Sequence, residues 1–215
     1  MKSLLFGIVL IIIVGFGGLV YRNAVEHPSR PVACQADAKV CPDGTSVGRT
    51  EPSCTFPACP PPNVSLLDTG IAYAVPEDFV IIALPDSASV VAYEMSDPVS
   101  IEPLATIVIR RYAINASSTA LATIQQTAIG GASGLPVPTT AYSSTVIGTK
   151  RFTVVNIERF EGVVDTAYYL ARSTDVLRFD AIDREVMNWT DVSLDISRLP
   201  ANTSLRELLA TLQGG

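Results

Sequence analysis

Histidine and lysine are scarce in this 215-residue chain, and their scarcity excludes several functions. The sole histidine is His27, and Lys150 is the only lysine after residue 62. Acid–base catalysis near neutral pH relies mostly on histidine, so residues 63–215 hold no histidine-dependent catalytic centre. Acidic residues outnumber basic ones by 21 to 15, which gives a formal net charge of −6. Nucleic acid is not expected as a partner, because phosphate binding needs clustered Lys and Arg.

Cysteine is absent after residue 59 and is confined to one short segment. The spacing is C-x6-C-x12-C-x4-C, formed by Cys34, Cys41, Cys54 and Cys59. Structural zinc usually takes two close pairs, each with about two to four intervening residues, and only the last pair approaches that spacing. Two disulfides are therefore favoured over zinc, with all three pairings open. Disulfides indicate an oxidising compartment.

A nearly unbroken apolar run extends from Leu4 to Val20, directly behind Lys2. A transmembrane helix needs about 17 to 25 apolar residues, whereas the apolar part of a signal peptide has about 7 to 15. The length favours a retained single-pass anchor, residues 1–24, over a cleaved signal peptide. Basic residues flank both ends, so orientation rests on the cysteines, which favour an extracytoplasmic body.

Residues 25–62 form a second segment that combines the cysteines with prolines. Cys-Pro-Asp-Gly, Val-Gly-Arg and a closing Cys-Pro lie between Cys34 and Pro60. This stretch resembles a four-cysteine cassette of uncharacterised exported bacterial proteins. The resemblance implies a spacer or a small interaction module and no activity. Pro60, Pro61 and Pro62 favour an extended polyproline course into the next domain.

Residues 63–215 are predicted to form one domain that is mostly β-structure. Runs rich in β-branched and aromatic residues are bounded by Pro, Gly and Asp, as expected for strands. Short turns between the last four runs favour an antiparallel meander. The predicted strands are Ile71–Val75, Phe79–Leu84, Ser89–Met95, Ala105–Tyr112, Thr139–Ile147, Arg151–Phe160, Gly162–Arg172 and Val176–Ile182.

Two helices are predicted in the same domain. Ser117 and Ser118 can cap a helix over residues 120–128, which Gly130 and Gly131 would end. Asn202 is the expected N-cap of a C-terminal amphipathic helix, and residues 192–196 form either an edge strand or the approach to that helix. The expected fold class is α+β, with an antiparallel sheet flanked by two helices after the anchor and the stapled module.

The opening motif of the domain resembles a known family. Tyr73-Ala74-Val75-Pro76-Glu77-Asp78-Phe79 gives an aromatic-x-x-Pro-x-x-Phe pattern, followed by one early helix, a meander and a closing helix. This order is similar to that of PsbP-like domains. The resemblance implies an antiparallel sheet between helices and an accessory or binding role, and it transfers no site residues.

Candidate functional side chains gather late in the chain. Tyr168, Tyr169 and Trp189 could line a sugar or peptide groove, or else fill the core. A series of carboxylates with interleaved arginines is favoured as a solvated ion-pair face over a catalytic or calcium site. These residues are Asp175, Arg178, Asp180, Asp183, Arg184 and Glu185.

Together these features predict a membrane-anchored extracytoplasmic accessory or binding protein without a catalytic centre, cofactor or metal. Its expected partners are membrane lipid, through the N-terminal helix, and an envelope protein or polymer. One alternative is a cell-envelope hydrolase or metal-dependent enzyme that uses the carboxylates between Asp175 and Glu185. Another is a structural subunit of a membrane complex.

Overall fold

The structure is a computed structural model of the chain, and it describes residues 12–18, 21–22, 34–41, 46–57, 59, 62–95 and 104–215. The chain divides into two compact units, one of residues 1–39 and 46–58 and one of residues 40–45 and 59–215. The second unit is continuous from residue 59 onward, so the predicted boundary at residue 63 falls shortly after that point.

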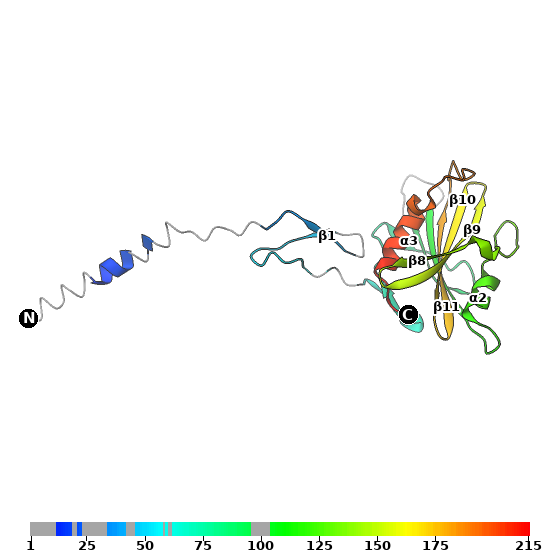
Figure 1. The fold of residues 1–215 in the computed structure, drawn as a ribbon, viewed down its shortest axis with the longest axis horizontal. Helices are drawn as coiled ribbons and strands as arrows, with labels where there is room; N and C mark the ends of the chain where they lie inside the picture. The colour runs from blue at the N-terminus through cyan, green and yellow to red at the C-terminus, as the bar shows by residue number, and fades with distance from the viewer. Residues whose placement is uncertain are drawn as a thin grey trace, which may run out of the picture. The chain divides into compact units, whose positions relative to one another are not determined.

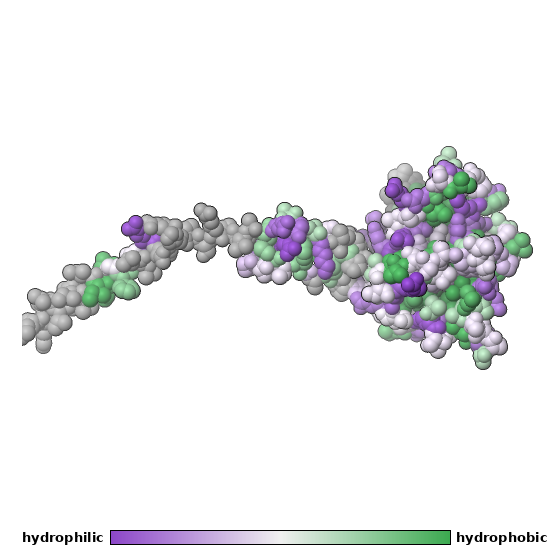
Figure 2. Space-filling view, in the orientation of Figure 1, coloured by the Kyte–Doolittle hydropathy of each residue, from purple (hydrophilic) through white to green (hydrophobic). Residues whose placement is uncertain are grey.

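Residues 12–18 of the first unit are helical and expose apolar side chains, including Ile12, Ile13 and Phe16 (Figure 2). Among the described residues, no helix is long and apolar enough to cross a membrane. Most of the predicted anchor, Leu4 to Val20, lies outside the described residues.

The four cysteines form two interleaved disulfides, which confirms the predicted chemistry and selects one of its three pairings. Cys34 pairs with Cys54, and Cys41 pairs with Cys59. Strands β1 (Ala38–Val40) and β2 (Ser46–Gly48) form the two-stranded sheet of this segment. A small polar cluster supports it, because Arg49 donates to Asp37 and to the carbonyl of Cys54, and its guanidinium lies over the Phe56 ring.

The second unit is built on a seven-stranded antiparallel sheet, as predicted. Its strand order is β5-β6-β7-β11-β10-β9-β8, so the last four strands form the expected meander. The strands are β5 (Phe79–Ile81), β6 (Ser89–Met95), β7 (Ala105–Ala113), β8 (Tyr142–Ile147), β9 (Lys150–Phe160), β10 (Val163–Ala171) and β11 (Asp175–Asp183).

A three-stranded sheet joins the start of this unit to the end of the chain. Its order is β12-β4-β3, from β3 (Val64–Leu66), β4 (Ile71–Tyr73) and β12 (Gln213–Gly214). The short helix η1 (Leu67–Thr69) connects β3 to β4. Gly214 has a φ of +76°, and a Cβ there would clash with the carbonyl oxygen of Gly70. Only glycine fits this close approach of two backbones.

Helices α2 (Ala120–Thr127) and α3 (Pro200–Ala210) pack against the sheet in two separate hydrophobic cores. Leu205, Leu208 and Leu209 of α3 pack with Phe152 and Phe179 of the sheet. Ile124 at α2 packs with Val155, Ala167, Tyr169 and Val176, whose side chains alternate with those of the first core along β9, β10 and β11. Alternation along a strand places neighbouring residues on opposite faces, so the two helices flank the sheet as predicted (Figure 1).

The predicted helix boundaries need correction. Thr119, not Ser117 or Ser118, caps α2, because its side chain accepts a hydrogen bond from the N–H of Ala122. The α2 helix ends at Thr127, before the glycines. Asn202 does not cap the C-terminal helix, because that helix already begins at Pro200. Proline is favoured in the first helical turn, and Asn202 therefore lies inside the helix.

Residues 192–196 do not form an edge strand. They belong to the segment that leads from β11 to α3. The short helix η3 (Ile196–Arg198) lies near the end of this segment, just before α3. A further short helix, η2 (Thr139–Ala141), precedes β8 at the start of the predicted strand Thr139–Ile147.

Candidate functional site

An open pocket of about 510 Å³ lies where the turn from β10 to β11 meets the η1 segment. Its walls are mostly polar and come from four parts of the domain that are far apart in sequence. They are Asp68, Thr69, Gly70, Arg111, Ala171, Arg172, Ser173, Thr174, Asp175 and Gly215.

Asp175 organises this pocket, although its side chain is only 1% exposed. The guanidinium of Arg172 donates to both carboxylate oxygens, with the Nη2–Oδ2 distance at 2.6 Å. Arg111 Nε donates to the same Oδ2 at 2.6 Å. Burial raises the pKa of Asp175, but the hydrogen bonds from Arg172 and Arg111 outweigh burial and hold that pKa below its usual value. Asp175 is therefore an ionised anchor for two arginines.

The two arginines differ in how many guanidinium nitrogens remain without a hydrogen bond. Arg172 uses its third nitrogen, Nη1, to bond the carbonyl of Thr69, so every nitrogen of its guanidinium is engaged. Arg111 bonds Asp175 and the carbonyl of Asp68, while its Nη2 makes no hydrogen bond to a described residue. The side chain of Arg111 is 42% exposed. Arg111 is thus a positioned cation whose Nη2 can still donate hydrogen bonds.

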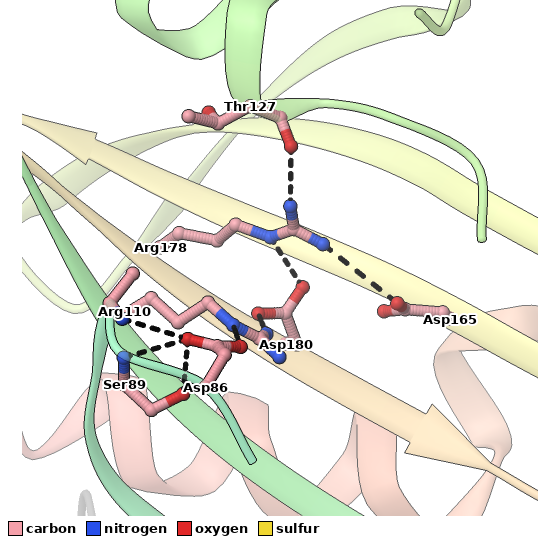
Figure 3. Close-up of polar contacts among 8 residues, drawn as sticks. Asp86, Ser89, Arg110, Thr127, Asp165, Arg178 and Asp180 are labelled. Carbon is pink, nitrogen blue, oxygen red and sulfur yellow. Dashed lines mark hydrogen bonds and ion pairs between the residues drawn. The ribbon is translucent and has the colours of Figure 1, made fainter. Parts of the chain in front are cut away.

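A second polar network lies under α2, and Figure 3 shows its members. Asp180 is fully buried and accepts from Arg178 Nε at 2.6 Å and from Arg110. Arg110 also donates to Asp86 at 2.8 Å. Arg178 extends toward Asp165, whose Oδ2 lies 3.8 Å from its Nη2. The result is an alternating chain of charges across three neighbouring strands and the turn before β6.

Arg178 links this network to the helix above it. Its Nη1 donates to the carbonyl of Thr127, the last residue of α2, at 2.6 Å (Figure 3). A cation at a helix C-terminus interacts favourably with the helix dipole. Its guanidinium also lies 5.7 Å from the centre of the Tyr169 ring. Burial lowers the pKa of Arg178, but the charge of Asp180 outweighs it and raises the pKa further above its usual value.

Asp165 is the least satisfied member of the network. Its side chain is 14% exposed, and its buried Oδ1 has no hydrogen-bond partner among the described residues. Burial, reinforced by the charge of Asp180, raises the pKa of Asp165 to about 8. With Asp165 protonated, the two guanidiniums of Arg110 and Arg178 balance the two carboxylates of Asp86 and Asp180. Charge neutrality is favoured inside a low-dielectric interior, which agrees with the raised pKa of Asp165.

The structure does not bring the predicted carboxylates together. Asp175 and Asp183 lie at the two ends of β11, and Asp180 lies on the opposite face. Asp183 accepts from the N–H of Ala201, and Glu185 is exposed in the segment that follows. Among the described residues, no three His, Cys, Asp or Glu side chains are placed to hold one metal ion. The favoured interpretation was a solvated ion-pair face. Asp175 and Asp180 do form ion pairs, but in separate networks, and solvation was predicted wrongly because both carboxylates are buried.

Arg184, the remaining residue of that series, donates to the hydroxyl of Thr106 at 2.8 Å. It joins neither the pocket nor the chain of ion pairs.

The three aromatic residues do not line one groove. Tyr168 and Tyr169 are adjacent on β10 and are buried on opposite faces, Tyr168 in the core of α3 and Tyr169 in that of α2. Trp189 lies in the segment after β11 and packs edge-on against Phe160. Tyr168 lines a cavity of about 210 Å³, where its hydroxyl donates to the buried Asn202 at 2.7 Å. The core-filling alternative therefore describes the two tyrosines.

The sequence did not single out Arg111, Arg172 or Asp165. Arg172 and Asp175 flank a two-residue turn, and that spacing is a local signal for an ion pair across a hairpin. Arg111 and Asp68 are 43 residues apart, and no local pattern connects them.

Comparisons with known proteins give distant structural neighbours only. No protein-family model and no curated protein sequence matches the chain. A crystal structure from Bacteroides thetaiotaomicron is similar at a TM-score of 0.45 and 13% identity, over 67% of this chain and 45% of that one. The present chain therefore spans less than half the length of that neighbour.

The solution structure of the cyanobacterial PsbP protein CyanoP from Synechocystis is also similar. Its TM-score is 0.45 and its identity 12%, over 71% of this chain and 91% of that one. At these values neither similarity assigns a family or a function.

Proposed function

We propose that this protein is a membrane-anchored extracytoplasmic binding protein whose folded domain holds a partner at the pocket beside Asp175. The observation that carries the proposal is the pair of arginines fixed on that buried carboxylate. Arg172 is fully engaged, whereas Arg111 is positioned by two hydrogen bonds and still has a free Nη2 in the open pocket. Prepositioned donors reduce the entropy lost on binding, which is typical of recognition sites.

Nothing in this pocket favours catalysis over binding. Its buried carboxylate carries two cations and a lowered pKa, so Asp175 is a poor proton acceptor near neutral pH. The other carboxylates of β11 point elsewhere, which removes the support for a hydrolase built on them.

The proposal includes the cellular location of the protein, with a membrane anchor and an extracytoplasmic body. The two disulfides support an oxidising, extracytoplasmic compartment for the body. The apolar run from Leu4 to Val20 supports a single-pass anchor. Protease treatment of intact cells tests both: the body should be digested from outside, and thiol labelling should require prior reduction. A protected body with directly labelled thiols would contradict this location.

Site-specific photocrosslinking tests the binding role. A photoreactive residue replaces the exposed Thr174 of the pocket in the full chain, and a matched control carries it at the exposed Glu207 of α3. We expect a discrete adduct at Thr174 that is absent at Glu207 and is lost when Arg111→Gln is added. Equal adducts at both positions, or none at Thr174, would reject the proposed pocket. A stable complex that survives Arg111→Gln would instead favour a structural subunit.

A further inference from the structure

We propose that the pocket beside Asp175 recognises a carboxylate of a protein partner, through the guanidinium of Arg111 and the turn at Ser173 and Thr174. This inference rests on the proposed binding function and specifies its ligand chemistry. It follows from three features of the pocket: the free donors of Arg111, the free donors of the turn and the balance of charges.

Arg111 supplies the first set of donors. Asp175 fixes its Nε, and the carbonyl of Asp68 fixes its Nη1 at 3.0 Å, so the plane of the guanidinium is set before any ligand arrives. Its Nη2 is not bonded to any described residue. A planar guanidinium with a free edge suits an oxyanion.

The turn between β10 and β11 supplies the second set. Arg172 N–H donates to the carbonyl of Asp175, which closes a two-residue turn at Ser173 and Thr174. Neither central residue has a positive φ. Within the described chain, the main-chain N–H groups and hydroxyls of both residues have no partner. All four donors belong to residues that line the pocket of Arg111.

The charge balance selects the type of anion. The side chains that line the pocket carry two positive charges, on Arg111 and Arg172, and two negative charges, on Asp68 and Asp175. The pocket therefore has donors for an oxyanion without an excess of positive charge. A carboxylate adds one negative charge, whereas a phosphate adds nearly two and meets more repulsion from Asp68.

A protein partner fits this pocket better than a sugar acid. Aromatic side chains usually provide the stacking surface for a sugar ring, and the lining residues include none. The pocket is also open and borders the exposed turn, so an acidic side chain or a chain terminus can reach it from a larger surface.

The test uses the full chain in detergent, labelled with ¹⁵N in the backbone and arginine side chains. N-acetylglutamate is titrated in, with the uncharged N-acetylglutamine amide as its matched control. We expect saturable shifts of the Arg111 side-chain and Thr174 main-chain signals, with a Kd of about 1 mM for so small a ligand. The uncharged analogue should leave these signals unchanged.

Three variants separate recognition from folding. Arg111→Gln should weaken binding at least tenfold, whereas Arg151→Gln, at an exposed position of β9 outside the pocket, should not. Ser173→Pro removes one N–H donor at an exposed residue without a positive φ, and binding should weaken several-fold. Thermal unfolding of each variant shows whether the domain is intact.

The remaining outcomes decide against the inference. Inorganic phosphate or glucuronate that binds more tightly than N-acetylglutamate at the same signals would replace the protein carboxylate with that ligand. No saturable shift, or equal binding by Arg111→Gln, would overturn carboxylate recognition altogether. An adduct at Thr174 in the crosslinking experiment would then still support a partner at this pocket, bound through other chemistry.

Discussion

The carboxylate of Asp183 accepts a hydrogen bond from the main-chain N–H of Ala201 at 2.7 Å, across 18 residues of sequence. Asp183 is the last residue of β11, and Ala201 is in the first turn of α3. The helix has no cap from its own N-cap residue, Leu199. A carboxylate from the sheet therefore satisfies a free N–H of the helix and fixes α3 on its core.

Replacing Asp183 tests this cap and its pH dependence. Burial raises the pKa of Asp183 to about 6, against the opposing effect of the N–H groups of Ala201 and Asn202. Between about pH 4 and pH 6 the folded state binds more protons than the unfolded state, so the free energy of unfolding should fall as pH rises. Asp183→Asn should remove this slope, as measured by thermal unfolding at several pH values.

Asp183→Ala should also lower the free energy of unfolding by about 0.5 to 2 kcal/mol, since it deletes the cap. Glu207→Gln, an exposed change on the same helix, is the control and should leave both quantities unchanged. An unchanged slope in Asp183→Asn would show that Asp183 is not the titrating group.

Asp165 should govern stability in a higher pH window. Its pKa is raised to about 8, so the folded state keeps a proton that the unfolded state loses near pH 4. The free energy of unfolding should therefore decline up to about pH 8. Asp165→Asn should abolish the decline between pH 6 and pH 8 and exceed the wild type in stability at pH 8.5. The exposed control Glu77→Gln should keep the decline of the wild type. If the free energy of unfolding of Asp165→Asn also still declines between pH 6 and pH 8, the prediction is wrong.

Arg178→Met should be strongly destabilising. The fully buried Asp180 would keep only Arg110 as a cation, and the carbonyl of Thr127 would lose its donor. Breaking a buried ion pair costs about 3 to 5 kcal/mol, whereas the exposed change Arg151→Met should cost little. Chemical denaturation measures both.

The double variant Arg178→Met with Asp180→Leu tests the same explanation. It removes both buried charges, and Arg110 keeps its ion pair with Asp86. We expect it to regain most of the stability that Arg178→Met loses, because an apolar pair can replace a buried ion pair. If the double variant is less stable than Arg178→Met, packing and not charge determines the effect.

The disulfide between Cys34 and Cys54 should protect the segment around Arg49. Cross-links of this kind contribute about 2 to 4 kcal/mol, and Arg49 bonds Asp37 and the carbonyl of Cys54. Cys34→Ser with Cys54→Ser should increase trypsin cleavage after Arg49 roughly a hundredfold. Cleavage after Arg206 of α3, followed by mass spectrometry, is the internal control. Equal cleavage of Arg49 in both proteins would mean that the remaining contacts hold the segment.

Local pattern was sufficient for the seven strands of the main sheet and for the disulfide chemistry of the cysteines, but it did not predict the short strands β3 and β12. Segments such as Ser89–Met95 were predicted with their observed bounds, since β-branched residues between turn formers leave few other conformations. Cap positions were predicted less well. The sequence favoured Asn202, a good N-cap residue, but Pro200 starts the helix earlier and Asp183 supplies the cap from another element.

By itself the sequence determined the order of the main strands from β4 to β11 and of the two α-helices, favoured disulfides for the four cysteines and showed that residues 63–215 lack histidine. Tertiary structure decided which charges meet. Arg110 reaches Asp180 across 70 residues and Arg111 reaches Asp175 across 64, and both contacts depend on the pairing of β7 with β11. Adjacent residues of a strand face opposite sides of the sheet, so this pairing sends Arg110 to the buried network under α2 and Arg111 to the open pocket.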